Sequence, residues 1–96
     1  MKSNYLIAVD EFCAKHNIEV SFVSSLHQTG LIEITTIEEN GFINIKQLEQ
    51  LEKFIQFYYE LEINLEGIET ITHLLQRVNA MQDEIITLKN RLGLYE

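Results

Sequence analysis

The C-terminal third of the chain carries an apolar repeat that commits it to one long helix. Eight apolar residues alternate between spacings of three and four, which is the a/d pattern of a coiled coil, and most of the a positions are β-branched. They are Ile71, Leu74, Val78, Met81, Ile85, Leu88, Leu92 and Tyr95. The spacing predicts a helix from Leu65 to about Leu92, in which Gly67 weakens only the first turn.

The length of this helix indicates that a second chain covers it. About 28 residues span roughly 42 Å, whereas the predicted helix before it has about 16 residues and offers roughly 24 Å of cover. The first two turns can pack on the chain's own domain, but soluble monomers rarely leave the remaining apolar seam in water. We therefore expect a homodimer. The predicted dimer interface is Ile71, Leu74, Val78, Met81, Ile85, Leu88 and Leu92.

The first thirty residues predict two short helices. Asp10 is a typical N-cap, and the helix that it starts ends at Asn17, a residue that tolerates the left-handed conformation. A second helix runs from about Val20 to Thr29, with Gly30 as its stop. Two short helices joined by a tight turn form a helix-turn-helix.

Residues 30–45, GLIEITTIEENGFINI, predict a β-hairpin. Isoleucines at 32, 34 and 37 alternate with polar residues, and Phe42 and Ile43 form the return strand. We place the turn around Glu39-Asn40-Gly41, because Asn-Gly between apolar residues is the strongest short-range hairpin signal. After a helix-turn-helix, such a hairpin is a wing.

A third helix follows, capped by Asn44 with Gln47 in the capping-box position. Its predicted buried stripe is Leu48, Leu51, Ile55 and Tyr58. The residues predicted to face away are Glu49, Glu52, Gln56 and Glu60. Phe54, Phe57, Tyr58 and Tyr59 are interpreted as core aromatics. A break near residues 62–64 precedes the long helix. The fold is mainly α, with a winged helix-turn-helix domain over residues 1–62 and a helical dimerisation region over 63–96.

The charge distribution argues against DNA as a partner. Fifteen acidic and seven basic residues give a net charge of −8, and no lysine or arginine lies between Lys15 and Lys46. The acids in that segment are Glu19, Glu33, Glu38 and Glu39. Because duplex DNA is bound largely by neutralising about 6 to 10 phosphates with lysine and arginine, this segment would meet repulsion. It favours a basic partner, and these four glutamates are the predicted partner-binding residues.

Nothing in the sequence predicts catalysis, a cofactor or a metal site. The three histidines are far apart and show no HExxH spacing; His16 and His27 lie near predicted helix ends, where they complement the helix dipole. Cys13 has no CxxC partner and is interpreted as a small buried hydrophobe. No apolar run approaches the roughly 18 residues of a membrane span, and the N-terminal apolar run is too short for a signal peptide. We expect a cytoplasmic protein that is not an enzyme.

The order of these elements resembles MerR-type regulators nearly end to end, through Gly-Leu-Ile at 30–32, Asn-Gly-Phe at 40–42 and Leu-Glu-Gly-Ile at 65–68. The resemblance is closest to one offshoot, the CbpM chaperone-modulator family. The residues that carry it are Glu-Phe-Cys at 11–13, Tyr-Glu-Leu at 59–61, Gly-Ile at 67–68 and Leu-Lys-Asn-Arg-Leu at 88–92. Together they cover about residues 6 to 92.

The chain departs from DNA-binding MerR proteins at the positions that grip phosphates. Those proteins typically carry an arginine followed by tyrosines in the second helix. By resemblance, the residues at the aligned positions in this chain are Ser24, Ser25 and Leu26. In the wing of those proteins an arginine usually follows a Gly-Tyr pair, and the matching residue here is Ile43. The residues on which phosphate binding depends are therefore missing.

The resemblance implies a regulatory binding protein. CbpM proteins bind the J-domain of a CbpA-type, DnaJ-like co-chaperone and inhibit its work with the Hsp70 chaperone DnaK. J-domains present a basic helix to DnaK, so an acidic partner can compete for that helix by charge complementarity. The resemblance also implies an antiparallel dimer. The alternatives that remain open are a MerR-type DNA-binding transcription regulator and a dimeric adaptor with another basic protein partner.

Overall fold

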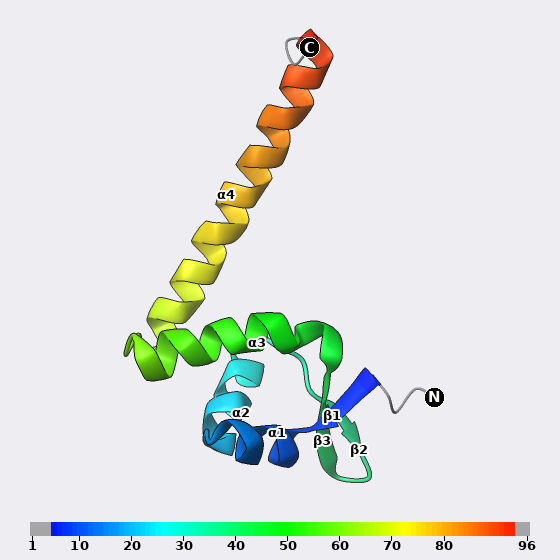
Figure 1. The fold of residues 1–96 in the computed structure, drawn as a ribbon, viewed down its shortest axis with the longest axis vertical. Coiled ribbons are helices and arrows are strands. Elements are labelled where there is room, and N and C mark those ends of the chain that lie inside the picture. Colours follow the sequence, from blue (N-terminus) through cyan, green and yellow to red (C-terminus); the bar gives the residue numbers. More distant parts are fainter. Residues whose placement is uncertain (1–4, 94–96) are drawn as a thin grey trace.

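The computed structural model describes residues 5–93, which form a small N-terminal domain and one helix that projects from it (Figure 1). The elements, in chain order, are β1 (Leu6–Ala8), α1 (Val9–His16), α2 (Val20–Gln28), β2 (Thr35–Ile37), β3 (Asn40–Asn44), a 3₁₀ turn η2 (Ile45–Gln47), α3 (Leu48–Ile55), a π-helical turn η3 (Gln56–Glu60) and α4 (Leu65–Leu92). The predicted fold class, mainly α with a winged helix-turn-helix layout and a long C-terminal helix, is confirmed. Tyr95 of the predicted seam lies outside the described residues.

The residues predicted to end the first two helices do so, but α1 begins at a different residue from the one predicted. Asn17 closes α1 in the left-handed conformation with φ of 57°. Gly30 follows α2 with φ of 84°, a conformation that glycine adopts without steric penalty. The predicted N-cap at Asp10 is wrong, because Ala8 occupies that position and α1 begins at Val9. Asp10 instead lies in the first turn, where a carboxylate stabilises the helix dipole.

The sheet has three antiparallel strands in the order β1-β3-β2, one more strand than the predicted hairpin. The additional strand, β1, pairs Leu6 with Asn44 and Ala8 with Phe42. This pairing fastens the start of α1 to the wing, so that the wing is the edge of a sheet that also leads into the helix-turn-helix (Figure 1).

The hairpin is present, but the predicted turn is wrong. Ile37 pairs with Asn40, so the loop consists of Glu38 and Glu39 alone. Both residues have positive φ, 51° and 68°, as a two-residue type I′ loop requires. Gly41 belongs to β3, and a Cβ there would lie 3.1 Å from the Ile34 side chain. Glycine at 41 therefore permits close packing rather than a turn.

The predicted cap, Asn44, starts the 3₁₀ turn η2 that leads into α3, whereas α3 itself begins at Leu48, and the predicted capping box is absent. The side chain of Asn44 accepts a hydrogen bond from the backbone N of Lys46 at 2.8 Å. The Gln47 side chain bonds to another residue, Glu33. It accepts a hydrogen bond from the backbone N–H of Glu33 and donates one to the Glu33 carbonyl, both at 2.8 Å. Gln47 thereby fixes the segment that leads into the wing.

The end of this helix widens into the π-helical turn η3, which changes the side that its last residues face. The backbone N of Leu61 donates to the carbonyl of Gln56, five residues earlier. Leu51 and Phe54 are fully buried, and Leu48 and Ile55 are partly buried. Tyr58 and Tyr59 are exposed, so their predicted place in the core is wrong, whereas the four predicted outward residues, Glu49, Glu52, Gln56 and Glu60, are all exposed.

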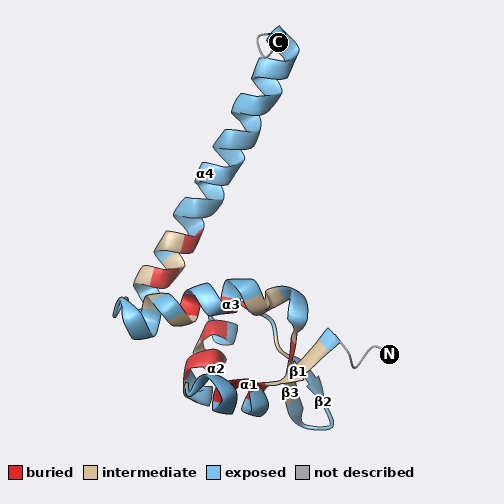
Figure 2. Cartoon of the chain, in the orientation of Figure 1, coloured by how far each residue is buried: buried red, intermediate tan, exposed pale blue. Residues whose placement is uncertain are grey.

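One core holds the domain together, and α4 contributes little to it (Figure 2). Eleven apolar residues from α1, α2, the segment before the wing, β3, α3 and α4 form the core. They are Val9, Phe12, Cys13, Phe22, Val23, Leu26, Ile32, Ile43, Leu51, Phe54 and Ile68. Only Ile68 comes from α4, whose first turn is capped by Asn64 through the Gly67 backbone N at 2.8 Å.

The hairpin loop yields a prediction about stability. Glutamate is strained in the left-handed region, so replacing Glu38 and Glu39 by Asn and Gly should raise the free energy of unfolding by about 1 kcal/mol. Urea unfolding at one fixed protein concentration measures the change. As a control, Glu49→Gly in α3 should lower the free energy of unfolding by about 1 kcal/mol. An unchanged or lower stability of the Asn-Gly variant contradicts the loop geometry.

Candidate functional site

The two elements that a winged helix-turn-helix uses to read DNA carry no lysine or arginine here. Helix α2 has the sequence VSFVSSLHQ, and the strands β2 and β3 with their loop read TTIEENGFIN. Their only carboxylates are Glu38 and Glu39, exposed at the tip of the hairpin. A phosphate backbone approaching this face would meet two negative charges and no lysine or arginine.

The four predicted partner-binding glutamates are all exposed, but they come from different parts of the domain. Glu38 and Glu39 lie at the wing tip, and Glu33 lies between α2 and β2, where Gln47 holds its backbone. Glu19 lies in the turn between α1 and α2, and its backbone N donates to the Tyr59 hydroxyl at 3.2 Å. They form an extended acidic border and not one compact cluster.

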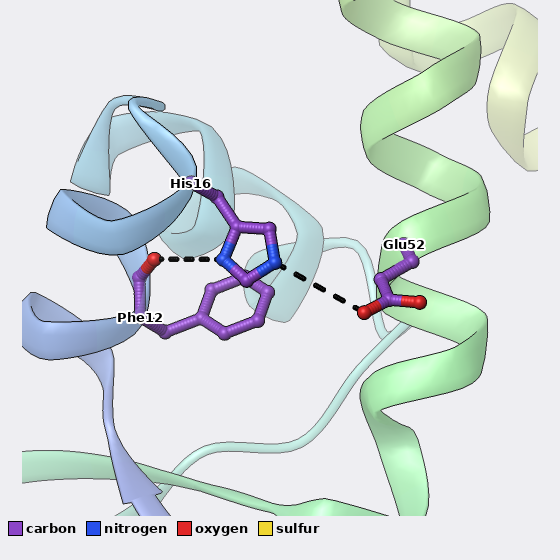
Figure 3. A network of polar contacts seen from close by, with 3 residues as sticks. All are labelled: Phe12, His16 and Glu52. Atoms are coloured by element: carbon purple, nitrogen blue, oxygen red, sulfur yellow. Dashed lines mark hydrogen bonds and ion pairs between the residues drawn. The ribbon is translucent and has the colours of Figure 1, made fainter.

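A shallow groove of about 550 Å³ runs between α1 and α3. Its floor is apolar, and His16 and Glu52 face each other across it (Figure 3). The His16 ring stacks on Phe12 with centroids 4.0 Å apart, and its Nδ1 donates to the Phe12 carbonyl at 3.1 Å. Its Nε2 is 4.0 Å from a Glu52 carboxylate oxygen. With the proton on Nδ1, that second contact becomes attractive only when the ring is protonated, and its partly exposed setting makes it weak.

The described residues offer no arrangement typical of catalysis. Cys13 is buried, and that burial, with a smaller effect from Asp10, raises the pKa of its thiol, which disfavours the reactive thiolate. Within residues 5–93, no group of three histidine, cysteine or acidic side chains gathers to hold a metal ion. His27 lies at the end of α2, with Nδ1 3.4 Å from the Ile32 carbonyl. It therefore has a structural contact of its own.

An aromatic surface that the sequence did not predict lies where η3 meets the start of α2. Two exposed aromatic residues, Tyr58 and Tyr59, form it, and we term them the tyrosine patch. The Tyr58 ring stacks on the buried Phe22 at 4.4 Å, and Tyr59 meets Tyr58 edge-on at 5.1 Å. A signal for this surface exists in the sequence, because the consecutive aromatics at 57–59 cannot all face the same side of a helix.

The third exposed surface is the apolar stripe of α4. Ile71 is partly buried, and beyond the buried Thr72 every described residue of the helix is exposed (Figure 2). The other predicted interface residues are each at least 45% exposed. They are Leu74, Val78, Met81, Ile85, Leu88 and Leu92. From residue 73 to 92 the free part of the helix is about 30 Å long, more than the overhang expected from the sequence. The preceding helix covers less of it because α4 turns away from α3 (Figure 1).

A comparison with protein families decides the class of molecule. A family model described as a MerR HTH family regulatory protein matches residues 7–90. The chain belongs to the MerR family of helix-turn-helix regulatory proteins. Comparisons with curated proteins and with solved structures each gave no match.

Membership of the MerR family identifies the chain as a regulator and agrees with the observed order of helix-turn-helix, wing and long helix. It also gives the α1–α2 pair and the hairpin the position that contacts DNA in a winged helix-turn-helix. In this MerR-family chain, α2 and the hairpin carry no lysine or arginine, and the hairpin loop is acidic. None of the helices over residues 5–93 is both long and apolar enough to cross a membrane.

Proposed function

We propose that this MerR-family chain is a regulatory binding protein of the CbpM type, which binds the J-domain of a CbpA-type co-chaperone and inhibits its action with DnaK. The observation that carries the proposal is the charge of the helix-turn-helix and wing. From residue 16 to 45 the chain has four glutamates and no lysine or arginine. A DNA-reading scaffold with this surface fits a basic protein partner better than a polyphosphate.

The proposed partner surface is the acidic border formed by Glu19, Glu33, Glu38 and Glu39. All four side chains are exposed, and within residues 5–93 none of them forms an ion pair with a basic side chain of the same chain. Their charge is therefore available to a basic helix. Occupying that helix would keep it from DnaK, which accounts for inhibition by competition.

We further propose that the chain acts as a homodimer through the stripe of α4. The free part of α4 presents apolar residues at a/d spacing to water over about 30 Å. Most of the stability of a helix in a protein comes from the packing of its apolar face, so a partner helix would stabilise both the fold of α4 and its apolar stripe. The MerR resemblance favours an antiparallel pair.

The proposed function predicts J-domain binding in the absence of DNA binding. The full chain is titrated against a CbpA-type J-domain and against mixed-sequence duplex DNA, each at low and at moderate salt. The J-domain should bind, with an affinity that falls as salt screens the charges, and the duplex should not bind. Binding to DNA without binding to the J-domain would replace this function with DNA-binding regulation.

The proposed surface predicts the effect of reversing its charge. Changing Glu33, Glu38 and Glu39 to lysine should weaken J-domain binding by about tenfold or more and reduce its dependence on salt. The control carries the same change in net charge on other exposed positions. It combines Glu49→Lys, Asp83→Lys and Glu84→Lys. If both variants weaken binding equally, the effect belongs to net charge and not to the acidic border.

The proposed dimer predicts the effect of a charge in the stripe. Ile85→Asp should convert the dimer to a monomer in sedimentation, because it would bury a carboxylate in an apolar interface. Glu84→Gln, at the neighbouring position, should leave the mass unchanged. A wild-type chain that sediments as a monomer removes the dimer from the proposal.

A further inference from the structure

The tyrosine patch has the composition of a binding surface and lies beside one of the four proposed partner-binding acids. Its two members are 37% exposed at Tyr58 and 40% exposed at Tyr59. Glu19 joins the patch directly, because its backbone N donates to the Tyr59 hydroxyl. Tyrosine is enriched where protein interfaces hold their partners most tightly, and π-helical turns such as η3 frequently occur at functional sites.

The rings of the patch are held in place before any partner arrives. Phe22 is buried and covers one face of Tyr58, so the exposed surface of that ring lies on the side away from Phe22. Tyr59 packs against both Phe22 and Tyr58 at nearly perpendicular angles, and its hydroxyl is fixed by Glu19. A ring that is already ordered loses little conformational entropy on binding, which makes it an efficient contact.

The charges around the patch favour a partner that presents a positively charged side chain. Glu60 and Glu62 follow Tyr59 within three residues, and both are exposed, as is Glu19. The nearest basic residues along the chain face other surfaces: Lys15 lines the groove between α1 and α3, and Lys53 lines a hollow between α3 and α4. The negative face of the Tyr58 ring attracts the charged group of an arginine or lysine that lies within about 6 Å of the ring centre.

We propose that the tyrosine patch anchors the basic helix of the J-domain, with an arginine or lysine of that helix stacked on Tyr58. This proposal rests on the proposed function and names where the apolar part of the contact lies. The exposed acids act at long range and speed association, whereas a well-packed aromatic contact slows dissociation. The patch and the acidic border therefore divide the binding between them.

The experiment measures the association and dissociation rates of the full chain with a CbpA-type J-domain. Tyr58→Leu keeps an apolar side chain but removes the aromatic face, and it should raise the dissociation rate by about tenfold, while the association rate stays within about twofold. Tyr58→Phe keeps the ring and should behave as wild type. Ile45→Ser is the control, because Ile45 is also 37% exposed but lies at the opposite end of α3, and it should change neither rate.

A second variant keeps the test decisive if Tyr58→Leu disturbs the fold, which circular dichroism would show. Glu60→Lys changes an exposed residue next to Tyr59, and it should slow association and speed dissociation. Wild-type rates for both Tyr58→Leu and Glu60→Lys remove the patch from the interface. Conversion of the Tyr58→Leu protein to a monomer in sedimentation also overturns the proposal, because the patch would then contact a second copy of the chain. If the wild-type chain does not bind the J-domain at all, the proposed function itself fails.

Discussion

The core of eleven apolar residues is the constraint on which the rest of the structure depends. It is small, and α1, α2, β3 and α3 fill it almost completely, so α4 supplies one core residue, Ile68, with Leu65 packed against it. The helix is therefore anchored at one end, where Ile68 and Thr72 are buried and Asn64 caps the first turn. Everything beyond Thr72 is free of the domain, which explains why one short chain presents both a compact domain and a long exposed helix.

The turn between the third helix and α4 decides the surfaces that the domain exposes. The π-helical turn η3 moves Tyr58 out of the buried stripe that Leu48 and Leu51 begin, while Phe54 remains in the core. The chain then leaves the helical conformation before Asn64 restarts it. One local change in helix geometry thus both exposes two tyrosines and directs α4 away from the domain (Figure 1).

The features that the sequence predicted well are those fixed by nearby residues. The end of α1 at Asn17 and the start of α4 after Asn64 depend on backbone and side-chain bonds within a few positions. The heptad spacing likewise depends only on the helix that carries it. The hairpin loop was misplaced because Gly41 meets packing demands from Ile34 and Val9, which local turn preferences do not describe. Strand β1 was missed because its partner β3 lies more than thirty residues along the chain.

The charge of the candidate surface could be predicted from the sequence for the same reason. Charge can be counted along the chain, so the acidic character of the wing was visible without a structure, and the exposure of Glu38 and Glu39 agrees with it. The position of Glu19 beside Tyr59 depends on a contact between residues forty positions apart.

A winged helix-turn-helix is a scaffold whose partner is decided by the few side chains on its outer face. Phosphate contacts supply much of the affinity for duplex DNA, and their number falls with each lost lysine or arginine. The fold itself does not depend on those residues, because the core of this domain is formed by apolar side chains that face inward. Loss of surface lysines and arginines therefore leaves the wing and the helices intact while it changes the sign of the surface charge. A regulator of this family can thus exchange a nucleic-acid partner for a basic protein without a change in architecture.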